Sequence, residues 1–398
     1  MNVKPFPLYP LAGIDNTSAR DDALQVGGAE RRVYVREAVN VTISHTGRAS
    51  MRPGLRKVSG LALDSLWQSP LHGDVFAVQA GQWVKVDTSS WDSAPLAEIG
   101  PGPAQHLVLN NLVLVAGTAG IFQFDGQAAQ RFALDTPPAP MVTAGAGSLA
   151  AGAYGVAVAW LRGAMESPLS PMTQCKVGPG GALDVILPLC MDATVTGARL
   201  YLTRPDGGEL LRGEDYSIGL AQVSIALLPS LGAGAQFRHM EPMPTGPHFG
   251  YWRGRLVSAR ANVLRFSEAL AYHVHDPRHG FVQMPQRITF LQPVDGGLWV
   301  GQVDHVAFLA GAAPADLQLV RKTSKAPVPG SAVALDAETA GEASGGGSAV
   351  VAWLASNGYV MGTADGSVVE PQGKRLTGIA GAKGTSIVFA NRLTTAVI

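Results

Sequence analysis

The chain has 398 residues, of which 46% are hydrophobic and only 15% are charged. This composition provides for a large core and excludes a wholly disordered protein, and the length predicts about two or three domains. The 30 Lys and Arg residues balance the 30 Asp and Glu residues, so no net charge would draw the whole chain to nucleic acid or an anionic membrane.

The N-terminal stretch MNVKPFPLYPLAGIDN is interrupted by prolines and lacks an apolar segment, so we expect no secretory signal. No run of about 18 uncharged apolar residues occurs, and we expect no membrane-spanning helix. The two cysteines, Cys175 and Cys190, form neither a disulfide framework nor a metal-binding motif. We therefore expect two reduced thiols in the core of a protein made in the cytoplasm.

The first predicted hairpin, residues 38–58, is unusually basic. It has an alternating strand, a turn at residues 44–47, and a second strand that Pro53 and Gly54 end. Between Arg31 and Lys57 there are seven Lys or Arg residues and a single acidic residue. These side chains are expected either to be solvated or paired, or to contact a partner.

Beyond this hairpin, one pattern recurs five times: an apolar strand, a turn of small residues, and a second apolar strand. Sustained helical periodicity is nearly absent, so we predict an all-β protein. The first residues after the five turns lie 39, 142, 42 and 54 positions apart, and they are Gln82, Ile121, Val263, His305 and Tyr359. Because a four-stranded propeller blade takes roughly 40–50 residues, two of these spacings fit one blade each.

The two longer spacings predict additions to this repeat. The spacing of 54 includes the Gly- and Ser-rich residues 340–349, which we expect to form a flexible loop. The spacing of 142 exceeds one blade by about 100 residues, the size of an immunoglobulin-like sandwich. Proline-rich linkers at residues 134–145 and 241–250 flank this excess. We therefore predict an inserted β-sandwich of the immunoglobulin or fibronectin type III kind at residues 137–244.

The predicted fold is thus a β-propeller of about six blades with an inserted sandwich. Residues 1–136 would form an N-terminal arm and the first blades, residues 137–244 the insert, and residues 245–398 the remaining blades. The hairpins at the two chain ends, residues 38–51 and 385–398, have fewer than four strands. Because open sheet edges favour aggregation, we expect the two hairpins to complete one shared blade, although a separate seventh blade remains an alternative.

The sequence lacks the motifs of common catalytic sites, phosphate-binding loops and zinc proteases, so we expect no enzyme activity, no catalytic residues and no cofactor. One cluster contains His273, His275 and His279. On a strand, the first two would share a face and could bind zinc or nickel, but no third ligand is evident. The nearby Arg265 and Arg278 also disfavour a bound cation. We expect a solvated or interface loop there, and no metal.

Two regions resemble a family of virion proteins, the tail nozzle or hub proteins of short-tailed bacteriophages. The N-terminal motifs that carry the resemblance are Gly13-Ile14-Asp15-Asn16, then Ala38, Asn40, Val41 and Ile43, then Gly47-Arg48, and then Arg52-Pro53-Gly54. The later motifs are Gly254-Arg255-Leu256, Leu264 to Glu268, Arg287 to Thr289, and Val328 to Val333. Within the insert, YGVAV and GARLYLT are also of the family type.

The resemblance implies a ring at the end of a phage tail, through which DNA leaves and which anchors fibres or a needle. Expected partners are further copies in a homo-oligomeric ring and other tail proteins (adaptor, fibres or needle). Genome DNA would pass in transit only, and stable membrane insertion is not expected. The protein would be assembled in the host cytoplasm and reside in the virion. The residues expected at subunit interfaces are Arg48, Arg52, Arg56, His273, His275 and His279.

Several alternatives remain open at this point. The low charge content fits either extensive contact with neighbouring proteins or a Gly- and Ala-rich genome. The three arginines could contact passing DNA phosphates, although zero net charge and the need to release DNA favour subunit contact. A propeller that binds or cleaves host-surface carbohydrate is the main rival, and a cytoplasmic interaction scaffold is the second.

Overall fold

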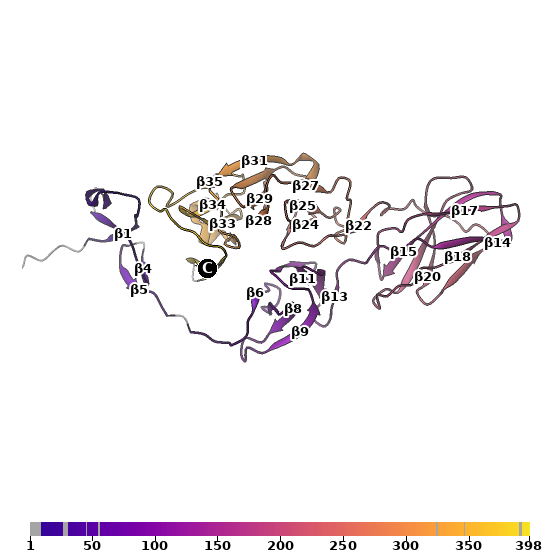
Figure 1. Ribbon diagram of the computed structural model, residues 1–398, viewed down its shortest axis with the longest axis horizontal. Coiled ribbons are helices and arrows are strands. Elements are labelled where there is room, and N and C mark those ends of the chain that lie inside the picture. Colours follow the sequence, from indigo (N-terminus) through magenta and orange to yellow (C-terminus); the bar gives the residue numbers. More distant parts are fainter. Residues whose placement is uncertain are drawn as a thin grey trace, which may run out of the picture. The chain divides into compact units, whose positions relative to one another are not determined.

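The computed structural model describes residues 9–26, 31–44, 46–54, 56–323, 325–345, 347–389 and 392–398. It divides into two compact units (Figure 1). Unit 1 comprises Met1–Leu61 with Met284–Ile398, and unit 2 comprises Ala62–Gln283. Both chain ends therefore belong to unit 1, whereas the sequence had suggested boundaries near residues 136 and 244. Within the described ranges, no helix is long and apolar enough to cross a membrane.

Unit 2 contains three four-stranded antiparallel sheets. Each sheet is ordered along the chain, so that consecutive strands pair. Their strands are β6 (Asp64–Gln68), β7 (Val75–Gln79), β8 (Gln82–Val86) and β9 (Ser93–Glu98); β10 (Gln105–Leu109), β11 (Leu112–Gly117), β12 (Gly120–Phe124) and β13 (Ala129–Arg131); and β23 (His248–Trp252), β24 (Arg255–Arg260), β25 (Val263–Phe266) and β27 (Phe281–Gln283). A short pair, β22 (Glu241–Pro242) with β26 (Val274–His275), lies outside them.

Unit 1 contains two further sheets of the same kind. Their strands are β28 (Ile288–Val294), β29 (Gly297–Gln302), β30 (Val306–Ala310) and β31 (Gln318–Thr323); and β32 (Val333–Leu335), β33 (Val350–Ala355), β34 (Gly358–Gly362) and β35 (Val368–Val369). In all five sheets, the strand–turn–strand unit predicted from the sequence forms the second and third strands. The recurring pattern therefore marks a four-stranded sheet each time.

Tight turns join neighbouring strands in two of these sheets. β7 and β8 are joined by Ala80 and Gly81, and β10 and β11 by Asn110 and Asn111. All four residues have positive φ angles. Two consecutive positive φ angles are typical of the type I′ turn, whose twist matches that of the flanking strands. Asparagine and glycine tolerate this conformation, so the local sequence fixes the register of each hairpin.

Aromatic side chains fill the cores of these sheets. Trp83, Trp299 and Trp353 are fully buried, as expected for tryptophans at strand positions. The rings of Trp299 and Trp353 lie 5.4 Å apart, so they join the two four-stranded sheets of unit 1. A Cβ atom on Gly362 would lie 2.4 Å from Cε2 of Trp299, which explains why this strand position carries no side chain.

A histidine lies in the corresponding core of unit 2. The ring of His106 stacks on Trp67 with centroids 5.2 Å apart and an interplanar angle of 5°. Phe76 and Trp83 also flank it. Among the described residues, its Nε2 atom is buried without a hydrogen-bond partner. Burial lowers the pKa of His106 to about 3, so the imidazole is neutral near pH 7.

Residues 141–225 of unit 2 form two sheets around one core. The first contains β14 (Met141–Leu149), β18 (Gly181–Ile186) and β21 (Gln222–Ile225). The second contains β16 (Met165–Glu166), β15 (Gly152–Arg162), β19 (Gly197–Leu202) and β20 (Leu211–Ser217), with β17 (Thr173–Val177) also paired to β15. In the described part of the chain, these strands pair with one another, apart from an isolated bridge between Leu211 of β20 and Gly234. We call this body the sandwich; its core includes Tyr154, Trp160 and Leu183, and the inserted immunoglobulin-like domain at residues 137–244 stays a prediction.

The chain ends form smaller sheets. β1 (Leu11–Ile14), β3 (Arg32–Val35) and β2 (Gln25–Val26) make a three-stranded sheet, with a 3₁₀ turn at Asp21–Leu24. β4 (Val41–Ile43) pairs with β5 (Ala49–Met51), and β36 (Gly384–Phe389) pairs with β37 (Arg392–Val397). We call these pairs the N-terminal hairpin and the C-terminal hairpin. They were expected to share one blade, but they form separate two-stranded sheets.

Two smaller predictions need correction. The Gly- and Ser-rich residues 340–349, expected to be a loop, begin with helical turns at α1 (Ala337–Ala340) and Gly341–Ser344, because Asp336 caps the backbone of Thr339. A further 3₁₀ turn spans Pro314–Asp316. Cys175 and Cys190 are free thiols, but both are half-buried rather than core residues. His45, in the turn predicted at residues 44–47, lies outside the described residues.

Candidate functional site

The Gly13-Ile14-Asp15-Asn16 motif anchors the N-terminal sheet to the segment that follows β35. The Asn16 side chain donates from Nδ2 to the carbonyl oxygen of Thr377 (2.9 Å) and accepts from the backbone N–H of Thr377 (3.0 Å). Its own backbone N–H donates to the carbonyl of Arg375 (2.9 Å). Asn16 thus imitates a paired strand residue. We call this contact between residues 15–18 and 374–377 the clasp.

Asp15 stabilises the loop that presents Asn16. Its carboxylate accepts hydrogen bonds from the backbone and hydroxyl groups of both Thr17 and Ser18, and the residue is only 4% exposed. Burial alone would raise the pKa of Asp15, but these hydrogen bonds outweigh it and lower the pKa to about 2. The hydroxyl of Thr17 also donates to the carbonyl of Lys374. The loop is therefore fixed in shape on both sides of Asn16.

A cation–π contact adds to the clasp. The guanidinium of Arg375 lies 4.3 Å from the ring centroid of Tyr34 on β3. Such a pair contributes about 0.5–1 kcal/mol at an exposed site. The two ends of the chain are thus joined by backbone, amide and aromatic contacts, all within unit 1.

The N-terminal hairpin is attached to β1 through its turn. The backbone N–H of Leu11 donates to the carbonyl of Gly47 (2.9 Å). Gly47 has a φ of +84°, and a Cβ atom there would lie 2.6 Å from Cβ of Pro10. Only glycine meets both requirements, which gives a structural reason for this residue of the motif.

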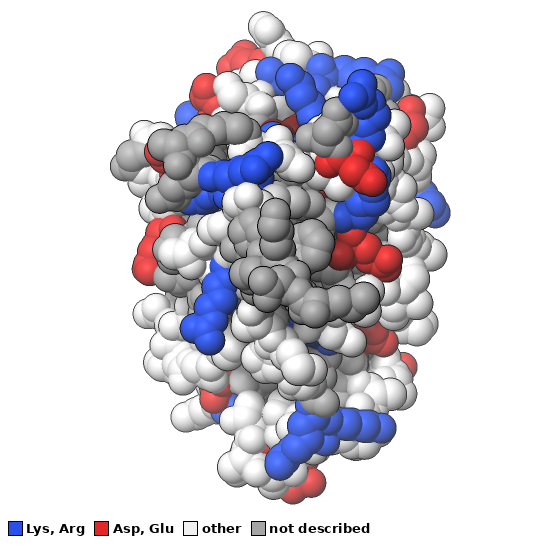
Figure 2. All heavy atoms as spheres, turned by 90° about the vertical axis from the view of Figure 1, so that its left-hand side faces the viewer, with Lys and Arg blue, Asp and Glu red and all other residues white. Residues whose placement is uncertain are grey.

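The three arginines expected at an interface lie in and just beyond this hairpin. Arg48, Arg52 and Arg56 are exposed, and among the described residues no partner binds their side chains. Met51 between them is 85% exposed. Figure 2 shows the face that includes the N-terminal strands, with separate groups of Lys and Arg side chains and acidic side chains beside some of them. The hairpin therefore presents positive charge and apolar surface that the described chain does not use.

The C-terminal hairpin packs on one face and is open on the other. On the packed face, Ser386 donates to the carbonyl of Ser331, and Tyr359 donates to Thr395 (2.9 Å). On the open face, Ile387 is 57% exposed and Phe389 is 76% exposed. The alternation of a strand explains this difference between its two faces.

The structure separates the three histidines instead of bringing them together. His273 contacts the carbonyl oxygen of Glu166 (2.9 Å), whereas His275 contacts that of Phe266 (2.8 Å). His275 is only 2% exposed, so its proposed role at a subunit interface is wrong: it has no surface to offer another chain. His279 is exposed and remains a candidate. Nowhere in the described residues do three His, Cys, Asp or Glu side chains converge in a group that could hold a metal ion.

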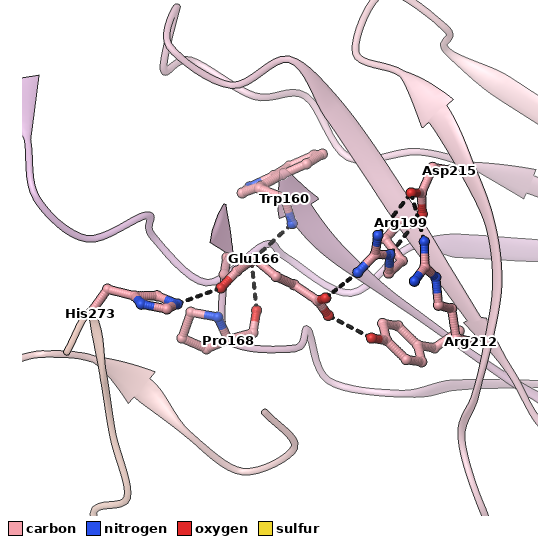
Figure 3. A network of polar contacts seen from close by, with 9 residues as sticks. Trp160, Glu166, Pro168, Arg199, Arg212, Asp215 and His273 are labelled. Carbon is pink, nitrogen blue, oxygen red and sulfur yellow. Dashed lines mark hydrogen bonds and ion pairs between the residues drawn. The ribbon is translucent and has the colours of Figure 1, made fainter. Parts of the chain in front are cut away.

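The contact of His273 leads into a network of charged groups on the sandwich (Figure 3). Glu166 on β16 accepts from Arg199 and from the hydroxyl of Tyr201 (2.6 Å), both on β19. Arg199 also makes a two-point contact with Asp215 on β20 (2.7 and 2.8 Å). Because a carbonyl oxygen only accepts, the His273 ring donates from Nε2. The network therefore connects three strands of the sandwich with the segment before β26.

The pKa values follow from this arrangement. Hydrogen bonds to Asp215 raise the pKa of Arg199, and the same bonds lower the pKa of Asp215. Burial raises the pKa of Tyr201 and lowers that of His273. Each shift favours the following states at neutral pH: charged Arg199 and Asp215, and neutral Tyr201 and His273. No local sequence pattern indicates this network, because its other members are 33 or more residues from Glu166.

One open pocket of about 450 Å³ lies at the end of the β6–β9 sheet. Its polar lining includes Asp74, Lys85, Asp87 and Asp92. Lys85 forms an ion pair with Asp74 (2.9 Å), so the charges partly neutralise each other. Ser89 donates to Asp87 from its hydroxyl and backbone, and these bonds lower the pKa of Asp87. The pocket can offer charged acceptors and one amine to a polar ligand.

Comparison with known proteins identifies no family for this chain: no family model matches it. No curated protein matches it either. Among solved structures, it is similar to the extracellular domain of the putative one component system BT4673 from B. thetaiotaomicron (9% identity, TM-score 0.34). That match covers 86% of this chain, which spans only 41% of the other.

Two other solved structures are similar over most of both chains. One is a functionally unknown protein from Desulfotomaculum acetoxidans DSM 771, with 10% identity, a TM-score of 0.34, and coverage of 81% of this chain and 89% of the other. The second is BBS1N in complex with ARL6DN, with 12% identity, a TM-score of 0.32, and coverage of 85% and 94%. These TM-scores lie below 0.5, so the similarities establish neither a shared fold nor a function.

Proposed function

We propose that the chain is a structural, non-enzymatic subunit of a bacteriophage tail that assembles as a ring, as a nozzle, hub or tail-tip component. In this proposal, the five four-stranded sheets and the terminal strands form a propeller of about six blades. Residues 137–244 form an immunoglobulin-like domain inserted between two blades. The partners are further copies and other tail proteins, with genome DNA passing in transit.

The observation that carries the proposal is the unused surface of the two terminal hairpins. Each has two strands, whereas each of the five sheets that contain the repeated unit has four, and each hairpin exposes apolar side chains. The clasp keeps both chain ends within one unit. Open edges and exposed apolar side chains are features that proteins normally cover, and a neighbouring subunit would cover them here.

The mechanism in this proposal is mechanical. Each four-stranded sheet satisfies its inner backbone groups by its own ladders, which gives a stiff block. The sandwich and the hairpins then supply the faces on which neighbours bind. Arg48, Arg52 and Arg56 are assigned to subunit contact, since a DNA channel that held phosphates tightly would oppose ejection.

The pocket beside β6–β9 supports a second candidate, binding of host-surface carbohydrate. Carboxylates and an amine such as those of Asp74, Asp87 and Lys85 are suitable partners for sugar hydroxyl groups. Binding of the purified chain to a glycan array, abolished by Asp87→Ala, would favour this candidate. No binding above that of the variant would remove it.

The oligomeric state tests the leading proposal. Mass photometry and negative-stain images of the purified chain are expected to give one symmetric ring. An antibody raised against the chain is expected to label the tail end of phage particles released from cells that carry its gene. A monomer that is absent from particles would contradict the proposal and favour the cytoplasmic scaffold.

A further inference from the structure

The C-terminal hairpin has an open backbone edge. β36 is fixed at its start, where the N–H of Gly384 donates to the carbonyl of Pro329 (2.7 Å). β37 pairs with β36, and among the described residues no other strand pairs with it. A two-stranded hairpin is marginally stable by itself, and an unpaired edge is a template for an additional strand. β37 is therefore an acceptor edge.

The N-terminal hairpin has the matching properties of a donor. It too has two strands, and in the described part of the chain β4 and β5 pair with each other alone. Val39, Val41 and Met51 expose apolar surface on and beside it, as Ile387 and Phe389 do on the C-terminal hairpin. Two strands from each hairpin would make four, the number in each of the five complete sheets.

Within one chain, this pairing is not made. The N-terminal hairpin is held at its turn by the bond between Leu11 and Gly47, and the clasp fixes the loop after β1. Although both hairpins belong to unit 1, no described hydrogen bond joins β4 or β5 to β36 or β37. The chain thus carries a donor and an acceptor that do not meet in one copy.

We propose that the N-terminal hairpin of one copy adds to the β37 edge of a second copy and completes a four-stranded sheet between the chains. This step rests on the proposed ring and names the contact that builds it. Donor and acceptor are different segments of the chain, so the contact is heterologous, and it forms a ring when the rotation between copies closes. Main-chain hydrogen bonds would provide the attachment, and the apolar side chains of both hairpins would be buried together.

Cross-linking between chains tests the proposal. In a background with Cys175→Ser and Cys190→Ser, one chain carries Met51→Cys and a second chain, with a larger tag, carries Thr394→Cys. Both positions are exposed. After mixing, unfolding and refolding, a short bis-maleimide is added. As a matched control, Leu189→Cys on the sandwich replaces Met51→Cys, since this side chain is also largely exposed.

The expected result is a covalent dimer of unequal tags, roughly 10²-fold more abundant than with the control, because bound partners hold the thiols at high effective concentration. If a chain with both Met51→Cys and Thr394→Cys cross-links mainly within itself, the two hairpins pair within one copy. That result would overturn the proposed contact between copies. A ring that shows no cross-linking above the control would overturn the proposed hairpin contact between copies but not the proposed ring. A monomer under all conditions would overturn both the proposed contact and the proposed function.

Discussion

His106 is one of several described residues that have a buried polar side-chain atom without a hydrogen-bond partner, and it is the one histidine among them. Its neutral ring stacks on Trp67, and its buried Nε2 has no partner among the described residues. A proton on the buried Nε2 atom would be placed among the aromatic rings of Trp67, Phe76 and Trp83. The residue is therefore a point at which pH acts directly on the core of the β6–β13 sheets.

His106 should make the stability of unit 2 depend on pH. Its pKa is about 3 in the folded chain, below the ordinary value of 6.5, so the unfolded chain binds the proton more readily. The stabilisation is thus complete above pH 6.5 and is lost as the pH falls toward 3, by up to about 1.4 kcal/mol per pH unit. Denaturant unfolding followed by tryptophan fluorescence should show this loss between pH 7 and pH 5. The His106→Phe variant should lose less free energy of unfolding over the same pH interval. Equal losses in the two proteins would contradict the assignment of this pH dependence to His106.

Glu166 should be required for the sandwich network. Its side chain is 13% exposed and binds both Arg199 and Tyr201. Glu166→Gln keeps the shape but removes the charge, and should lower the free energy of unfolding of the sandwich by about 1.5–3 kcal/mol. Glu209→Gln, at an exposed position of the same body, serves as the control and should change little. Equal effects of the two substitutions would show that the network contributes nothing specific.

At the scale of elements, the clasp and the two hairpins decide how the chain ends behave. The strand patterns of the five central hairpins were visible in the sequence because each has apolar alternation and a turn of small residues. For the clasp, the sequence showed only the Gly13-Ile14-Asp15-Asn16 motif and not the segment that it contacts. Its partner Thr377 is 361 positions from Asn16, and nothing in local periodicity links the two. The sharing of one blade by the hairpins was expected but is not what their pairing shows.

Removing the Asn16 side chain should release the N-terminal sheet. Asn16→Ala deletes both hydrogen bonds to Thr377 and leaves the backbone N–H and carbonyl groups of Thr377 without these partners. Hydrogen exchange measured by mass spectrometry should rise at residues 11–26 and 374–379, by about tenfold for a loss of 1.4 kcal/mol. Gln127→Ala, an exposed amide, is the control. Unchanged exchange in Asn16→Ala would contradict the role of the clasp.

Reversing the charge of the N-terminal hairpin should impair assembly. The triple substitution Arg48→Glu/Arg52→Glu/Arg56→Glu changes three exposed arginines that bind nothing among the described residues, so the fold should be preserved. The ring expected in mass photometry should be lost, because the reversed charge would repel the neighbouring subunit. Lys176→Glu/Arg204→Glu on the sandwich is the control. Retained assembly with weaker, salt-dependent binding of DNA would instead assign these arginines to the DNA path.

At the scale of the whole molecule, the sequence predicted the kind of secondary structure and the order of the repeated units along the chain. It predicted the pairing of the chain ends less well. All-β structure and the five repeated units followed from periodicity and spacing, whereas the inserted domain at residues 137–244 stays a prediction. The Glu166 network, the burial of His275 and the two separate terminal hairpins did not. The first two depend on separate segments that meet in space, and the third on distant segments that do not pair. Neither alternation nor turn chemistry specifies which distant segments meet.

The most direct measurement is a cryo-electron microscopy reconstruction of phage particles that carry this gene. The account predicts a symmetric ring at the tail, with each density containing a propeller and a projecting sandwich. It also predicts that the N-terminal hairpin of each subunit lies against β37 of its neighbour. A tail without this chain, or a chain found only as a free monomer in the cell, would contradict the account.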